Sequence, residues 1–187
     1  EKYPFSQIDW LVDKKNAQVL NGNKYINNIA VNDDKVFNFL TSNKYSIVIN
    51  LDLSPESLSF ASLSFGDKKI GYWIDKSRNI KYSNKYAGQW LLTSAYDVLK
   101  KANTQTYQFW MSKILDLPKD DYEIIVPVSK QAKQKAENFL VSNNINKSKI
   151  IGINPGAGKR WKMKKWNIEK YTELIKGRNI GQYLLQL

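Results

Sequence analysis

The sequence predicts an α/β fold built on mostly parallel sheets. Along most of the 187 residues, short apolar runs alternate with amphipathic segments, which is the pattern of repeated strand–helix–strand units. The run at 45–51 (YSIVINL) is apolar almost throughout, as expected for a parallel strand that is buried on both faces. At 150–170 an apolar run leads into a glycine-containing turn, a basic loop and a helix-like segment, an order that builds anion sites in α/β proteins.

The N-terminal part of the chain alternates strands and helices. The helix after the 45–51 strand has the clearest start, because Ser54 can cap it and Pro55 suits its first position. Strands are predicted at 8–12, 25–31, 45–51 and 69–74, and helices at 14–20, 33–40 and from residue 55 onward.

The remaining part is richer in helix. Ser129 and Asn167 are predicted helix caps, and Gly177 suits the end of the last helix. Aromatic residues recur at helical spacing within 87–101 and 104–115, where a core role is favoured over a ligand platform. We predict helices at 87–101, 104–115, 130–141 and 167–177, strands at 122–128, 150–153 and 183–187, and a domain boundary in the polar stretch 143–149.

Composition limits the chemistry that the chain can perform. Hydrophobic residues at 42% and charged residues at 25% are ordinary for a globular protein. Cysteine is absent, which excludes disulfides and thiol catalysis, and histidine is absent, which excludes histidine bases and histidine-ligated metals. Acid–base chemistry is therefore left to Asp, Glu, Lys or Tyr. No apolar run approaches the roughly 20 residues of a membrane-spanning helix.

The formal net charge of +12 raises the question of an anionic partner. Most lysines are scattered singly on predicted solvent faces, which disfavours nucleic acid as that partner. An anionic small molecule or an anionic membrane surface fits the charge at least as well.

The basic loop matches no familiar phosphate loop. The spacing from Gly152 to Gly158 is one residue too long for the Walker pattern, and Arg160 stands where that pattern needs a hydroxyl. The small residues Gly156, Ala157 and Gly158 would still let backbone N–H groups approach a ligand, within a loop that carries Lys159, Arg160, Lys162, Lys164 and Lys165. Spacing alone leaves two interpretations open: a pyrophosphate or sugar-phosphate site, and a plain strand–helix turn beside a solvated basic loop.

The string N-P-G-A-G-x-R-W-x-x-K-x-W-x-x-E-K-Y at 154–171 resembles the signature that opens the C-terminal domain of the lipopolysaccharide heptosyltransferases, glycosyltransferase family 9. Four earlier blocks are similar to the same family and follow in its order. They are IDWLVDKKNAQVLNGNKYINNI, YSIVINLDLSPESLSFASLS, KKIGYWID and NTQTYQFW. The resemblance therefore covers nearly the whole chain.

The resemblance implies a GT-B architecture, in which two Rossmann-like domains face each other across a cleft. Residues 1–128 would form the acceptor-side domain without its first strand–helix unit, and 129–149 a connecting helix and linker. Residues 150–187 would begin the donor domain, so the chain is expected to be truncated at both ends, with an incomplete second domain. The catalytic base that the resemblance implies would lie before residue 1. We therefore expect little or no transferase activity from this chain alone.

The implied reaction moves heptose from ADP-heptose to the inner core of lipopolysaccharide, with inversion and without metal or other cofactor. The implied partners are a nucleotide-sugar donor and an anionic lipopolysaccharide acceptor. The implied location is the cytoplasm of a Gram-negative bacterium, at the inner membrane surface. Two alternatives stay open: a non-catalytic module that binds nucleotide-sugars or anions, and, less favoured, a basic nucleic-acid-binding protein.

The resemblance also assigns residues to the donor site. Lys164 matches a lysine that contacts the donor phosphate, and Gly156, Ala157 and Gly158 match the phosphate-facing loop, with Arg160 in the same predicted set. Trp166 matches a tryptophan before the helix, for which we favour a packing role.

Asp52 is the acid that remains as an acceptor-side candidate. It directly follows the predicted 45–51 strand, at the edge where open α/β sheets place their ligands. The favoured alternative is structural, because an acid at this position can also close the turn before Pro55 or cap the helix that follows.

Overall fold

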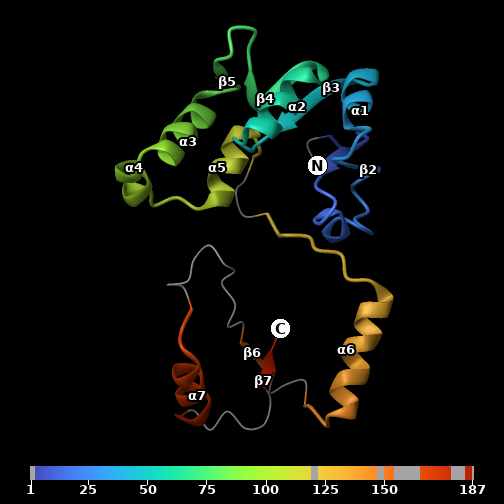
Figure 1. Cartoon of the computed structure of the whole chain (residues 1–187), viewed down its shortest axis with the longest axis vertical. Helices are drawn as coiled ribbons and strands as arrows, with labels where there is room; N and C mark the ends of the chain where they lie inside the picture. Colours follow the sequence, from blue (N-terminus) through green and yellow to red (C-terminus); the bar gives the residue numbers. More distant parts are fainter. Residues whose placement is uncertain (1–2, 119–121, 147–149, 154–164, 178–183, 187) are drawn as a thin grey trace. The chain divides into compact units, whose positions relative to one another are not determined.

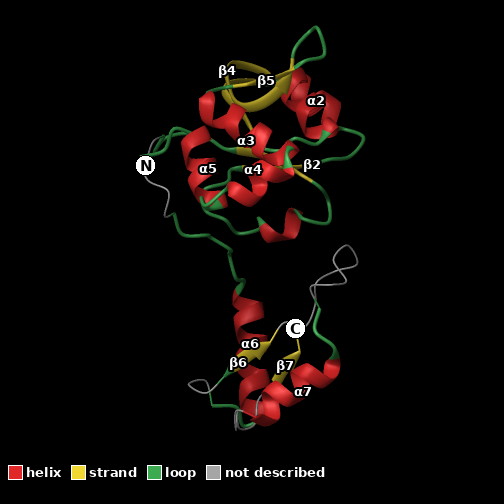
Figure 2. Cartoon of the chain, turned by 90° about the vertical axis from the view of Figure 1, so that its left-hand side faces the viewer, coloured by secondary structure: helices red, strands yellow, loops and turns green. Residues whose placement is uncertain are grey.

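The computed structural model describes residues 3–118, 122–146, 150–153, 165–177 and 184–186 (Figure 1). The chain divides into two compact units, Glu1–Pro127 and Val128–Leu187, and each is described by itself. Both units mix helices with parallel strand pairs (Figure 2), as the sequence predicts. Among the described residues, no helix has the length and apolar character needed to cross a membrane.

The first unit contains two separate sheets. Strand β1 (Asp9–Val12) pairs in parallel with β2 (Asn28–Val31), in a register that sets Asp9 opposite Asn28. Strand β3 (Lys44–Asn50) pairs in parallel with the first part of β4 (Phe65–Ile74). The last three residues of β4 pair instead, antiparallel, with β5 (Ile80–Tyr82), so β4 changes partner along its length.

The helices of this unit begin where polar residues cap them. In α2 (Pro55–Leu63) the Ser54 side chain accepts from the Ser57 amide, as predicted. Asn84 caps the third helix and Thr106 the fifth in the same way. The helices besides α2 are α1 (Val36–Ser42), α3 (Lys85–Ala95), α4 (Asp97–Ala102) and α5 (Tyr107–Ile114), with a 3-10 turn η1 at Ala17–Val19.

Three predicted elements differ from the structure. The helix predicted at 87–101 is two helices, because Tyr96 adopts an extended backbone (ψ 121°) between α3 and α4. The helix predicted at 14–20 is only the turn η1. The strand predicted at 122–128 is wrong: these residues form no ladder in the described part of the chain, and Pro127 has no N–H to offer one.

The core of the first unit lies between β4 and the helices α2, α3 and α5. Tyr72 of β4 is completely buried, and its hydroxyl donates to the Ala87 carbonyl oxygen at 2.9 Å. Ile114 of α5 is almost as deeply buried. The other buried members of this cluster are Leu58, Ile70, Ala87 and Met111.

The second unit contains a strand–helix–strand motif preceded by a long helix. Helix α6 (Lys130–Ser142) is capped by Ser129, whose side chain accepts from the Ala132 amide at 3.1 Å. Strand β6 (Ile151–Ile153) pairs in parallel with β7 (Leu184–Gln186), and α7 (Ile168–Gly177) lies between them in sequence. The strand predicted at 150–153 is therefore confirmed, and the one predicted at 183–187 is confirmed over its described residues 184–186.

Candidate functional site

The predicted phosphate loop lies outside the described residues. Gly156, Ala157, Gly158, Arg160 and Lys164 all fall within 154–164. What the structure provides is the frame on either side of this loop, which is β6 before it and α7 after it.

That frame has the polarity of an anion site. In the parallel pair β6–β7 the carboxyl ends of both strands lie at the same edge, and the chain leaves β6 at that edge. It then enters α7 at the helix N-terminus, where free N–H groups and the helix dipole favour negative charge.

The start of α7 is ordered by local contacts. The Asn167 side chain accepts from the Lys170 amide at 3.2 Å, so Asn167 caps the helix as predicted. The rings of Trp166 and Tyr171 lie 5.6 Å apart between centroids, at 48°. This contact agrees with a packing role for Trp166, which keeps half of its surface exposed.

Asp52 organises the turn between β3 and α2. One carboxylate oxygen accepts from the Ser54 amide at 3.0 Å, and the other accepts from the hydroxyls of Ser54 and Ser57, both at 3.1 Å. Partial burial raises the pKa of Asp52, but the hydrogen bonds from Ser54, Ser57 and the Leu53 backbone outweigh it and lower the pKa below its usual range. The carboxylate is thus ionised and engaged, which suits a structural anion better than a general base.

Two residues beside Asp52 escaped the sequence prediction. The Asn50 amide nitrogen donates to the carbonyl oxygens of Asp52 and Tyr72, at 3.0 and 2.9 Å, which ties the end of β3 to β4. Gly71 has a φ of +88°, and a Cβ there would stand 1.8 Å from the Asn50 carbonyl oxygen. A glycine inside an apolar strand is the signal that could have indicated this close approach.

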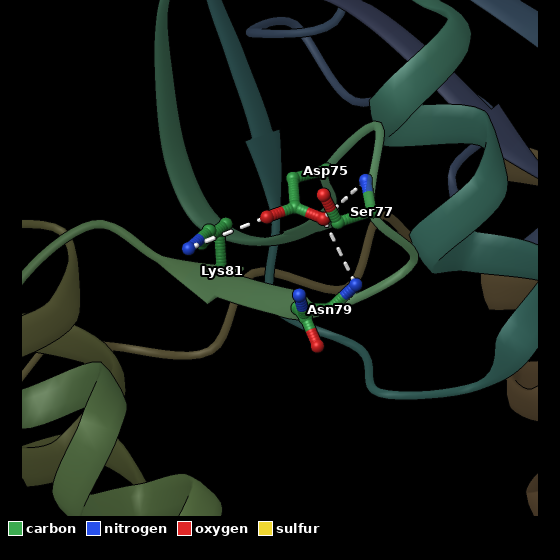
Figure 3. Close-up of polar contacts among 4 residues, drawn as sticks. All are labelled: Asp75, Ser77, Asn79 and Lys81. Atoms are coloured by element: carbon green, nitrogen blue, oxygen red, sulfur yellow. Dashed lines mark hydrogen bonds and ion pairs between the residues drawn. The ribbon is translucent and has the colours of Figure 1, made fainter.

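A second engaged acid is Asp75, in the turn between β4 and β5 (Figure 3). One of its oxygens accepts from the amides of Ser77 and Asn79, both at 2.9 Å, and the other lies 3.3 Å from the Lys81 ammonium. The Asn79 backbone hydrogen bond and the Lys81 charge lower the pKa of Asp75. Asp75 therefore closes a hairpin, and its contacts give no reason to place it in a ligand site.

The described residues contain no cluster of three or more acidic side chains that could hold a metal ion. The acids at the sheet edge and in the hairpin, Asp52 and Asp75, act singly.

A comparison with known families gives one match. The model of glycosyltransferase family 9 (heptosyltransferase) matches residues 34–185, a span that runs from just before α1 to within β7 and includes parts of both units. No curated protein and no solved structure matches the chain.

Proposed function

The chain belongs to glycosyltransferase family 9, and on this premise we propose that it supplies donor and acceptor contacts for the transfer of heptose from ADP-heptose to the inner core of lipopolysaccharide, while having little transferase activity by itself. Family membership implies a nucleotide-sugar donor and a glycan acceptor. The choice of heptose, of adenine nucleotide and of the lipopolysaccharide core is the proposal. So is the GT-B arrangement, with an acceptor domain, a connecting segment and a donor domain.

The donor diphosphate binds at the N-terminus of α7. Sugar transfer from a nucleoside diphosphate releases a leaving group whose negative charge must be stabilised. Residues 159–165 carry five cationic side chains, and the helix that follows presents the positive end of its dipole, with the Lys170 amide already bound by the Asn167 cap. Lys164 contacts the phosphates, Arg160 adds charge, and the turn at Gly156, Ala157 and Gly158 admits the ligand close to the backbone.

The acceptor lies on the first unit, where Asp52 stands at the carboxyl end of β3. Its carboxylate remains partly exposed, so a free lone pair can accept from a sugar hydroxyl. The lowered pKa argues against Asp52 as the base that deprotonates the attacking hydroxyl. We therefore assign Asp52 to acceptor positioning only.

The observation that carries the proposal is the family match across 34–185, which includes the basic loop. Isothermal titration of the full chain with ADP tests it, with Lys164→Ala as the variant. Loss of a charge-assisted hydrogen bond to phosphate costs about 1.5–3 kcal/mol, so the affinity should fall at least about tenfold. Lys176→Ala is the matched control. It removes the same charge as Lys164→Ala, but Lys176 lies in the last turn of α7, at the end of the helix away from the proposed donor site.

Three outcomes separate specific from unspecific binding. A loss confined to Lys164→Ala supports the donor site. An equal loss in both variants indicates a general charge effect and contradicts it. Absence of ADP binding to the unaltered chain at millimolar ligand also contradicts it. A titration of ADP-heptose beside ADP-glucose then tests the sugar, and we expect ADP-heptose to bind more tightly.

A further inference from the structure

The hairpin between β4 and β5 presents a cationic tip to solvent. Residues 76–82 are all exposed, and in Figures 1 and 2 the turn between the two strands projects beyond the helices of the first unit. This run carries Lys76, Arg78 and Lys81. Asp75 is the only acid within residues 68–96, so the surroundings of the tip in the sequence are strongly basic.

Asp75 neutralises only one of these three cations. One of its carboxylate oxygens lies 3.3 Å from the Lys81 ammonium, and the other accepts from the amides of Ser77 and Asn79 (Figure 3). Neither Lys76 nor Arg78 has an acidic partner among the residues that the structure describes. The tip therefore presents two positive charges that nothing in the described part of the chain neutralises.

The turn holds the tip in a fixed shape. The Arg78 amide donates to the Asp75 carbonyl oxygen, and the Asp75 amide donates to the Asn79 carbonyl oxygen, both at 3.0 Å. Arg78 has a φ of +64°, in the left-handed region, where a side chain brings strain that glycine would avoid. Backbone outliers of this kind are concentrated at functional positions. The strained position thus indicates a role for the guanidinium of Arg78.

The chemistry of the tip restricts its partner. Further protein laid over it would strip water from the two cations, which costs free energy unless acids meet both of them. A duplex nucleic acid is held through several phosphate contacts along a surface, whereas this tip offers two. An anionic bilayer supplies dense negative charge at a hydrated surface. Ile80, which is 40% exposed, adds an apolar side chain of the kind that interfacial segments place against lipid.

We propose that the β4–β5 hairpin is a contact site for an anionic membrane surface, with Lys76 and Arg78 among the lipid headgroups and Ile80 at the acyl boundary. Each cation close to such a surface strengthens binding by about fivefold. Two cations therefore give a weak, reversible contact, which adds to the general attraction of a chain of net charge +12. The contact belongs to the first unit and stands whether or not the second unit binds a nucleotide-sugar donor.

Co-sedimentation of the full chain with vesicles tests this. The vesicles contain equal parts of phosphatidylglycerol and phosphatidylcholine, and vesicles of phosphatidylcholine alone are the lipid control. We expect binding to the anionic vesicles only, with a marked loss at high salt, because exposed charges are then screened. The double variant Lys76→Ala, Arg78→Gly should bind about 30-fold more weakly. Lys14→Ala with Lys15→Ala removes the same charge from the turn between β1 and η1, and should weaken binding by about twofold at most.

Arg78→Gly alone separates the role of the charge from that of the fold. It should weaken vesicle binding about fivefold. The midpoint of urea unfolding should stay unchanged or rise, since glycine suits the left-handed position. Arg78→Lys keeps the charge and the strain, so its binding should stay within about twofold of the unaltered chain.

Three results would overturn the proposal. Equal losses from the two double variants would mean unspecific attraction of a basic chain. Absence of binding to the anionic vesicles at low salt would mean that the hairpin contacts no membrane of this charge. A duplex DNA that binds as tightly as the vesicles, and loses as much in the hairpin double variant, would assign the tip to nucleic acid instead.

Discussion

The two units of the chain are stabilised in different ways. Every buried hydrophobic side chain that the structure describes lies in the first unit, and most of them cluster around Tyr72 and Ile114. In the second unit, the described side chains of α6 and α7 are exposed or half-exposed; Phe139 keeps 46% of its surface and Ile168 keeps 76%. Among the described residues, the first unit thus has a buried core, whereas the second shows helix caps and one short parallel ladder.

This difference bears on where a ligand can act. Isolated helices of 10–13 residues are only marginally stable in water, so α6 and α7 would be only marginally stable on their own. A ligand that binds only the folded form stabilises it by about 2.7 kcal/mol at one hundred times its dissociation constant. Because the proposed donor site is in the second unit, donor binding should order that unit more than the first.

The largest expected change in the free energy of unfolding comes from truncating a buried side chain in the core of the first unit. Tyr72→Ala should lower the free energy of unfolding of this unit by about 4 kcal/mol, because it leaves a cavity and removes the hydrogen bond to Ala87. Phe139→Ala on α6 should cost under about 1 kcal/mol, since its ring is half exposed. Urea unfolding followed by residue-resolved hydrogen exchange measures both.

Tyr72→Phe is the control, since it removes only the hydroxyl and should cost about 1 kcal/mol. Similar losses from Tyr72→Ala and Phe139→Ala would contradict the view that the buried core of the described residues lies in the first unit.

A smaller difference in the free energy of unfolding is expected between substitutions at Asn84 and Asn167, which both cap a helix. Asn84 accepts from the Ala87 amide at 3.0 Å, and its own amide donates to the carbonyl oxygens of Lys113 and Ile114 at 3.2 and 3.0 Å. Asn84→Ala should therefore cost about 2 kcal/mol, because it uncaps α3 and frees two carbonyls at the end of α5. Asn167→Ala loses only the cap of α7 and should cost about 0.5–1 kcal/mol.

Asn84→Ser and Asn167→Ser keep the caps and sharpen the test. Serine should restore most of the loss at 167, but only the capping part at 84, because a serine hydroxyl cannot reach two carbonyls across the helices. Full rescue at 84 would mean that the α3–α5 tie contributes nothing.

Local signals allowed much of the fold to be predicted from the sequence. The run at 45–51, the caps Ser54, Ser129 and Asn167, and the strand–helix–strand order after residue 150 each depend on neighbours in the chain. These signals are read within a window of a few residues.

The features that were missed depend on distant residues. Strand β5 is short and exposed, and it exists because the Asp75 turn folds it back on β4. The tie between Asn50 and Tyr72 joins residues that are 22 positions apart. For the site, the sequence pattern predicted β6, α7 and the Asn167 cap of α7. The hydrogen bonds from the hydroxyls of Ser54 and Ser57 to the Asp52 carboxylate were not predicted, because they form only when the turn between β3 and α2 is folded.

The smallest expected effect concerns pH and the turn at Asp52. Its folded pKa lies below the unfolded value of about 3.9, so the ionised carboxylate stabilises the first unit above that pH. This contribution is lost as the pH falls through the lower, folded pKa. Because Asp52 is largely exposed, the effect should stay under about 1 kcal/mol. Unfolding of the unaltered chain and of Asp52→Asn is compared at pH 6 and below pH 3.

The stability difference between the two proteins should be present at pH 6 and shrink in acid, where the aspartate is protonated. It should also be confined to the first unit, since Asp52 caps a turn within it. A difference that persists unchanged in acid would mean that the shape of the side chain, and not its charge, holds the turn between β3 and α2. In that case, the charge of Asp52 contributes nothing measurable to the stability of the first unit.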